Sequence, residues 1–238
     1  MNNIYIASYN RADLVRTYEY LGCGKIVVPK SQEEAYRVRY GDAVVGIDDE
    51  LDGSAGKKRN AILDMIANNQ EDGYGWIIDD DLIKIRRKKE GKDLEKEDAI
   101  EILEALYLMA KEGGIKYGGL DYSTDNMKLK DYQPFSLTKI VFGGVLVYAN
   151  DNIRYDTRFR INEDVDFWVQ KLNKGRMLLK NNQYAMIFHG VDGGADSVIG
   201  YNNNDRRAYA TKLNNKWGQK LMVWNKSKFE FKTPIQGG

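Results

Sequence analysis

Residues 76–82 read Trp76-Ile77-Ile78-Asp79-Asp80-Asp81-Leu82, an apolar run that ends in three consecutive carboxylates. A strand of this kind cannot bury three acidic side chains without partners, so they are expected to project from its carboxyl end. Carboxylate oxygens suit a hard divalent cation, which would lie between them and a diphosphate. A solvated turn is the alternative interpretation, but the apolar strand directly before the acids favours a site.

The chain before residue 82 alternates short apolar runs with helical patterns. Expected strands are Ile4–Ala7, Lys25–Val28, Ala43–Ile47 and Trp76–Asp79, and helices are expected to begin at Ser8 or Asn10, at the capping-box pattern Ser31-Gln32-Glu33-Glu34 and at Gly56. Strands separated by helices in this way form right-handed crossovers and a mainly parallel sheet. Because ligands of such sheets bind beyond the carboxyl ends of the strands, we expect residues 8–11, 48–49 and 79–81 along one rim.

The later part of the chain is less regular. An amphipathic helix is expected over residues 98–111, and strand-like segments follow at 115–122, 139–148 and 176–188. With no internal repeat and no linker, the sequence predicts one α/β domain over residues 1–238, with a mixed, mainly parallel central sheet flanked by helices. Within it, residues 1–82 would form a nucleotide-donor half, residues 83–200 an acceptor and catalytic half, and residues 201–238 a basic and aromatic C-terminal segment.

Composition narrows the classes of protein that fit. The chain has 36 Lys and Arg against 35 Asp and Glu, a formal charge of +1, so net charge does not imply a general polyelectrolyte-binding surface. The single Cys23 excludes an intrachain disulfide and a Cys-based zinc site. No signal peptide and no membrane span are expected, because no apolar run approaches about 18 residues. The sequence therefore predicts a cytoplasmic protein without a membrane partner.

A second acidic cluster lies at the start of a predicted helix. Asn162 is a good N-cap for this helix, and the adjacent Glu163 and Asp164 occupy its first turn. Its buried stripe is expected to be Val165, Trp168, Val169 and Leu172. Acids in a first turn are also expected from the helix dipole alone, which leaves a structural interpretation open. At least one of the two carboxylates should still point away from the core, where it could accept a proton.

Two further segments have a functional and a structural interpretation. His189, the chain's only histidine, precedes a glycine-rich stretch and could complete a manganese shell, although a lone histidine is more often structural. The segment Gly56-Lys57-Lys58-Arg59-Asn60 could be a merely exposed helix start. Basic residues there oppose the helix dipole, however, which indicates an anionic partner such as a diphosphate.

Taken together, five motifs resemble those of the GT-A nucleotide-sugar glycosyltransferases and, more narrowly, the TET/JBP-associated glycosyltransferases. The motifs are Ala7-Ser8-Tyr9-Asn10-Arg11, Gly56-Lys57-Lys58-Arg59-Asn60, Trp76-Ile77-Ile78-Asp79-Asp80-Asp81, Phe142-Gly143-Gly144 and Glu163-Asp164-Val165-Asp166-Phe167. The narrower family includes phage enzymes and the base J glucosyltransferase, and it glycosylates 5-hydroxymethyl pyrimidines in DNA. The resemblance covers roughly residues 4–194, and the GT-A assignment is the firmer one.

The resemblance also implies roles for individual residues. Donor-binding residues would be Ser8, Asn10, Arg11, Arg59, Asp79 and Asp80, with Arg59 on the diphosphate or the base of the donor. Asp81 and His189 would hold Mn²⁺ or Mg²⁺. Asp164 would be the general base of an inverting transfer, and Glu163 would hold the acceptor or act as the base itself. If the transfer is retaining, this reasoning does not assign Asp164 as the base.

The function that the resemblance implies is metal-dependent transfer of a sugar from a UDP-type nucleotide sugar to 5-hydroxymethylcytosine or 5-hydroxymethyluracil in DNA, as in phage DNA hypermodification. The acceptor could instead be a saccharide or a protein, or the chain could be a silent binding module. Residues 201–232 carry eight Lys or Arg and two Trp, which suits a nucleic acid, although a solvated tail is an equal alternative. A flipped base would stack on an exposed aromatic such as Tyr122, Tyr201 or Trp217.

Overall fold

The computed structural model describes residues 3–124, 132–175, 177–189, 203–218, 220–225 and 228–231. Strands in these ranges are β1 (Ile4–Ala7), β2 (Lys25–Pro29), β3 (Val44–Ile47), β4 (Tyr74–Asp79), β5 (Leu82–Arg87), β6 (Lys92–Asp93), β7 (Tyr117–Asp121), β8 (Phe135–Ser136), β9 (Gly144–Tyr148), β10 (Leu179–Phe188), β11 (Met222–Asn225) and β12 (Lys228–Phe231). Helices are α1 (Arg16–Leu21), α2 (Lys30–Tyr40), α3 (Ala55–Asn69), α4 (Lys96–Glu112), α5 (Glu163–Gly175) and α7 (Asn203–Trp217). Short 3₁₀ turns span Gly41–Ala43 and Asp49–Leu51.

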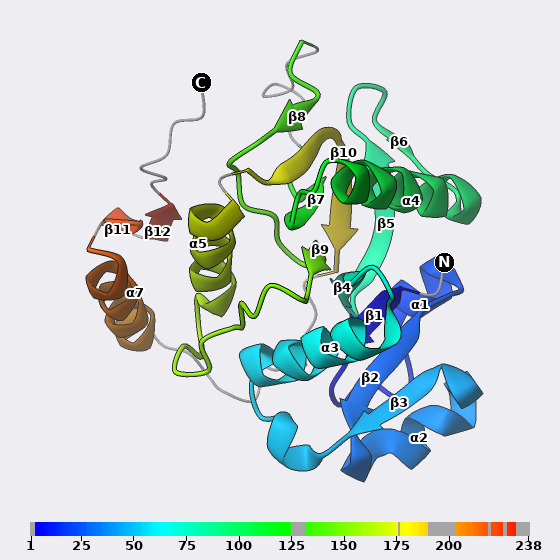
Figure 1. Ribbon diagram of the computed structural model, residues 1–238. Coiled ribbons are helices and arrows are strands. Elements are labelled where there is room, and N and C mark those ends of the chain that lie inside the picture. The colour runs from blue at the N-terminus through cyan, green and yellow to red at the C-terminus, as the bar shows by residue number, and fades with distance from the viewer. Residues whose placement is uncertain are drawn as a thin grey trace.

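Ten of the described strands form one mixed sheet (Figure 1). Its order is β3-β2-β1-β4-β9-β7-β10-β5-β6, and β8 pairs with β10 outside this path. The part built from β3, β2, β1 and β4 is parallel, as the alternating sequence pattern predicts. Beyond it, β9 runs antiparallel to β4 and β7, and β5 runs antiparallel to β10.

Helices cover both faces of this sheet. Alternate residues of β1 point to opposite sides, so Tyr5 joins one core whereas Ile4 and Ile6 join the other. The first core includes apolar residues of α3, α5 and α7, and the second includes residues of α1, α2 and α4. Between the two helix layers, the carboxyl ends of β1 and β4 lie side by side, since these strands pair in parallel up to Ala7 and Asp79.

The helix expected from Ser8 or Asn10 begins only at Arg16. Backbone N–H groups of the preceding loop donate to tyrosines of α2: Arg11 N to Tyr36 Oη at 2.7 Å and Val15 N to Tyr40 Oη at 2.7 Å. These bonds satisfy donors that a helix would otherwise satisfy internally, so tertiary contacts override the local preference. Asn10 itself has a φ of 54°.

The prediction of a capping box at Ser31 is also wrong in detail. Helix α2 begins at Lys30, and no side chain of its own caps it. Instead, Ser31 N donates to Asp49 Oδ1 at 3.0 Å, so a carboxylate from the loop after β3 caps the helix from outside.

The C-terminal segment is in part helical. Residues 201–202 lie outside the described ranges, and α7 begins at Asn203. None of the described helices combines the length and the apolar character that crossing a membrane requires.

Candidate functional site at the rim of the sheet

The acidic stretch ends β4 with Asp79 and continues as a turn through Asp80 and Asp81. Thr17, buried in α1, holds this turn from one side. Its Oγ1 donates to Asp79 O at 2.5 Å and accepts from Leu82 N at 3.0 Å, and its N–H donates to Asp80 O at 3.2 Å. The sequence pattern gave no sign of Thr17, because its partners lie more than sixty residues away.

Gly143 holds the turn from the other side. Its carbonyl oxygen accepts from Asp79 N at 2.7 Å, and its φ of 71° is one that L side chains rarely adopt. A Cβ at this position would lie 2.5 Å from the ring of Phe188. The glycine of the Phe142-Gly143-Gly144 motif is therefore required by both conformation and space.

Asp80 points into the protein and is 6% exposed. Its Oδ2 accepts from Ser8 Oγ at 2.6 Å, and its Oδ1 accepts from Arg11 Nη1. Burial raises the pKa of the Asp80 carboxyl, while the bonds to Ser8 and Arg11 oppose that rise. Asp80 thus ties the loop after β1 to the turn after β4. Asn10, in the same loop, is exposed and pairs with Gln32 of α2 through both its backbone N–H and its side chain.

Asp81 is the carboxylate of the turn that stays accessible, with a side chain 21% exposed. Burial, followed by the negative charges of Asp79 and Asp80, raises its pKa to about 6, and Arg11 at 3.8 Å opposes this. His189, exposed at the end of β10, donates its backbone N–H to Asp81 O at 2.9 Å. The two residues expected to share a metal ion therefore lie next to each other, although the described residues contain no ready cluster of three ligating side chains.

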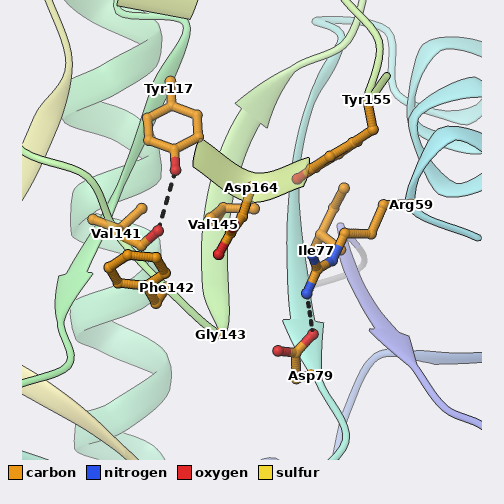
Figure 2. A pocket seen from close by; sticks show the side chains of 10 residues that line it. All are labelled: Arg59, Ile77, Asp79, Tyr117, Val141, Phe142, Gly143, Val145, Tyr155 and Asp164. Atoms are coloured by element: carbon orange, nitrogen blue, oxygen red, sulfur yellow. Dashed lines mark hydrogen bonds and ion pairs between the residues drawn. The ribbon is translucent and has the colours of Figure 1, made fainter. Parts of the chain in front are cut away.

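Arg59, near the start of α3, connects the two acidic clusters. Its Nη2 lies 2.9 Å from Asp79 Oδ1 (Figure 2). Its Nη1 lies 3.0 Å from Glu163 Oε1. The neighbouring Lys58 is 4% exposed and pairs with Asp52 at 3.0 Å. The basic helix start thus meets carboxylates of this chain, and the alternative of a merely exposed helix start is wrong for Lys58 and Arg59.

Glu163 and Asp164 open α5, as expected, and the predicted apolar stripe of that helix is buried. Burial and the adjacent Asp164 raise the pKa of Glu163 to about 7, while Arg59 opposes the rise. Burial also raises the pKa of Asp164, and Arg59 again opposes it. Such raised values suit groups that take up and release a proton near neutral pH.

A pocket lies at this rim. Its lining residues are Arg59, Ile77, Asp79, Tyr117, Val141, Phe142, Gly143, Val145, Tyr155 and Asp164. In Figure 2, Arg59 and Asp79 lie on one side, Val141 and Phe142 on the other, and Asp164 between them. Asp164 faces this pocket, whereas the carboxylate of Glu163 is engaged by Arg59.

The first turn of α5 is anchored by α7, which lies beside it in Figure 1. Asp166, fully buried, accepts from Trp217 Nε1 at 2.9 Å and pairs with Lys216 Nζ at 2.7 Å. Lys212 Nζ also donates to Arg158 O at 3.0 Å. Part of the basic C-terminal segment therefore docks on the rest of the protein. Trp217 packs against the core, so its ring does not fit the expected role of a stacking surface for a base.

The charge at the rim fits a divalent cation. Asp79, Asp80, Asp81, Glu163 and Asp164 are five carboxylates, and the cations that pair with them are the guanidinium groups of Arg11 and Arg59. An excess of carboxylate oxygens is the donor set that Mn²⁺ and Mg²⁺ prefer. Asp81 is partly exposed, and the guanidinium of Arg11 lies 3.8 Å from its carboxylate.

Comparison with known proteins places the chain in a family. A model of the family described as TET-Associated Glycosyltransferase matches residues 2–193, and no curated protein matches the sequence. Among solved structures, S. aureus TarS (residues 1–349) in complex with UDP is similar with a TM-score of 0.50 and 12% identity, covering 92% of this chain and 72% of TarS. Glucosyl-3-phosphoglycerate synthase from Mycobacterium tuberculosis, in complex with Mn²⁺, UDP and glucosyl-3-phosphoglycerate, has a TM-score of 0.54 and 10% identity, covering 98% of this chain and 88% of the synthase.

These likenesses confirm the expected GT-A fold. Because the family model covers most of the chain, the chain belongs to the TET-associated glycosyltransferase family and is a glycosyltransferase.

Proposed function

We propose that this member of the TET-associated glycosyltransferase family transfers a sugar from a UDP-type nucleotide sugar to the hydroxymethyl group of 5-hydroxymethylcytosine or 5-hydroxymethyluracil in DNA, in phage DNA hypermodification. The observation that carries the proposal is a pocket lined by Asp79 of one acidic cluster and Asp164 of the other, with Arg59 paired to both clusters. UDP in TarS and Mn²⁺ with UDP in the mycobacterial synthase support the donor class. The family match supports the modified-base acceptor.

On the donor side, Asp80 keeps Ser8 and Arg11 in place, and the loop that carries Asn10 would contact the nucleoside. Asp79 and Arg59 face the pocket, where they would bind the sugar and the diphosphate. Asp81 and His189 would hold Mn²⁺ or Mg²⁺. When bound, the cation supplies positive charge that neutralises the leaving diphosphate.

On the acceptor side, Asp164 faces the pocket with a raised pKa. In an inverting transfer, its carboxylate accepts the proton of the attacking hydroxyl as the oxygen bonds to the sugar, while the bond between the sugar and the diphosphate breaks and UDP leaves. Glu163 is held by Arg59, which favours a role in orienting the acceptor over that of the base. In a retaining transfer the assignment of Asp164 as the base does not apply.

A saccharide or protein acceptor is the second candidate. It is favoured by the formal charge of +1 and by the docking of Lys212 and Lys216, which leaves fewer basic side chains for phosphate contacts. A cytoplasmic location, where nucleotide sugars and DNA are both present, fits the first candidate.

A screen of nucleotide sugars tests the proposal and separates these candidates. Each donor is incubated with Mn²⁺ and, in turn, hydroxymethylated DNA, unmodified DNA, an oligosaccharide mixture and a peptide mixture, and UDP release is measured. We expect one UDP-sugar whose consumption is stimulated only by hydroxymethylated DNA. Stimulation by the saccharides or peptides would favour the second candidate, and no consumption of any donor would indicate a silent binding module.

A further inference from the structure

Tyr122 is an exposed aromatic side chain directly after β7. Its side chain is 53% exposed, and its ring packs edge-on against Phe142, with 5.0 Å between the ring centroids. Phe142 in turn lines the pocket that Asp164 faces. β9 pairs with both β4 and β7, which brings the carboxyl end of β7 to the same rim as Asp79. Tyr122 and Phe142 therefore extend the pocket wall outward to the surface.

The backbone that carries Tyr122 is fixed by a group of buried charges. Asp121 Oδ1 accepts from Tyr122 N at 2.9 Å and from Ser123 N at 3.3 Å. The same carboxylate pairs with Lys180 at 2.8 Å and with Lys88 at 2.9 Å, whose side chains are 10% and 3% exposed. Ordering two lysines around one aspartate costs desolvation, so this group is expected to fix the position of the ring rather than to add stability.

The position of Phe142 indicates which substrate this surface faces. In Figure 2, Phe142 lies across the pocket from Arg59 and Asp79, the residues proposed to bind the donor. Asp164 lies between the two sides, so a group resting on Tyr122 and Phe142 would present its hydroxyl to Asp164 from the side away from the diphosphate. The surface thus belongs to the acceptor.

The chemistry of the surface favours a flat ring over a saccharide. Among the described neighbours of Tyr122, the charged groups of Asp121, Lys88 and Lys180 are paired with one another. Lys180 Nζ lies 5.5 Å from the centre of the Tyr122 ring while its charge is met by Asp121. A saccharide needs partners for many hydroxyl groups, whereas a nucleobase needs a π-face to stack on.

We propose that Tyr122, supported by Phe142, is the stacking platform for the base that carries the accepting hydroxymethyl group. The proposal rests on the transfer to a modified base described above and adds the subsite that binds it. An extruded base loses its stacking neighbours in the duplex, and a preformed aromatic surface at the pocket mouth replaces one of them.

Steady-state kinetics of Tyr122→Ala and Tyr122→Phe with a hydroxymethylated oligonucleotide test this platform. Tyr122→Ala should raise the KM for the oligonucleotide roughly tenfold, within the range for loss of one base stack, and should leave the KM for the nucleotide sugar at its parent value. Tyr122→Phe keeps the ring and should keep both KM values. Leu108→Ala is the matched control, because it removes an exposed apolar side chain from α4, on the other face of the sheet.

Parent-like KM values for the oligonucleotide in Tyr122→Ala would overturn the platform while leaving the proposed function intact. Equal rises in both KM values would also overturn it, since they would indicate a structural role for Tyr122. A parent enzyme that transfers sugar to no base at all would instead overturn the proposed function, and the platform with it.

Discussion

The donor side and the acceptor side of the rim use carboxylates in different ways. On the donor side, Asp80 is buried and bonded to Ser8 and Arg11, so its charge is used to fix two loops. On the acceptor side, Glu163 and Asp164 are adjacent, have raised pKa values and share the single guanidinium of Arg59. The first arrangement favours a fixed binding surface, and the second favours groups whose protonation can change.

Asp81 should show the largest effect, because it is the proposed carboxylate ligand of the metal ion on the donor side. Asp81→Asn keeps the shape of the side chain and removes its charge, so metal-dependent donor binding should be lost while the protein stays folded. Isothermal titration with UDP-sugar in the presence and absence of Mn²⁺ measures this. Parent activity should likewise vanish in excess chelator and return with Mn²⁺. Full activity in excess chelator would show that the reaction does not need a metal ion.

Asp164 should show the next largest effect, on turnover rather than on donor binding. Asp164→Asn removes the proton acceptor, so we expect turnover to fall by ~100-fold or more with donor affinity nearly unchanged. Glu163→Gln is the companion variant, because the two acids are adjacent. A comparable loss of donor affinity in Asp164→Asn would move this residue to a binding or structural role.

The pH dependence sharpens the same contrast. The pKa of Glu163 is raised to about 7, so protonation of this carboxylate should weaken its ion pair with Arg59 and lower kcat/KM of the parent as the pH drops through about 7. Glu163→Gln removes that carboxyl and should move the fall to another pH. If kcat/KM of the parent instead stays constant down to the pH range in which an ordinary carboxyl titrates, the raised pKa of Glu163 does not control the reaction.

The hydrogen bond from Trp217 to Asp166, which anchors α5 to α7, should show the smallest effect when it is removed. Trp217→Phe keeps an aromatic ring but removes the N–H that Asp166 accepts, which should lower the free energy of unfolding by about 1–3 kcal/mol and turnover by a few-fold. Thermal unfolding and kcat measured together test this, with Asn215→Ala on the exposed side of α7 as the control. Unchanged stability in Trp217→Phe would mean that Lys216 alone holds the helix.

The sequence predicted the strands of the donor side better than the contacts that hold them in place. The strand before Asp79 and its acidic end are local patterns, and the parallel strands follow from their alternation with helices. Thr17 and Tyr36 were not predicted, because they act through hydrogen bonds to residues distant in the sequence. Such partners carry no periodic signal.

Arg59 and Trp217 show a second kind of limit. The basic start of α3 was predicted to face an anion, and it does, but the anions are Asp79 and Glu163 of the same chain. Trp217 was considered as a stacking residue, and its N–H is instead bonded to Asp166. In both cases the residue type indicates the chemistry, and only the fold decides which group lies within reach.

The most direct test of the proposed transfer uses two oligonucleotides that differ in one hydroxyl group. One carries 5-hydroxymethylcytosine and the other 5-methylcytosine, and each is incubated with the parent enzyme, Mn²⁺ and the UDP-sugar found in the screen, with Asp164→Asn alongside. Intact-mass spectrometry should show one added sugar per hydroxymethylated base, no addition to the methylated oligonucleotide and far slower addition by Asp164→Asn. If neither the 5-hydroxymethylcytosine oligonucleotide nor one that carries 5-hydroxymethyluracil gains the mass of a sugar with the parent enzyme, the account is contradicted.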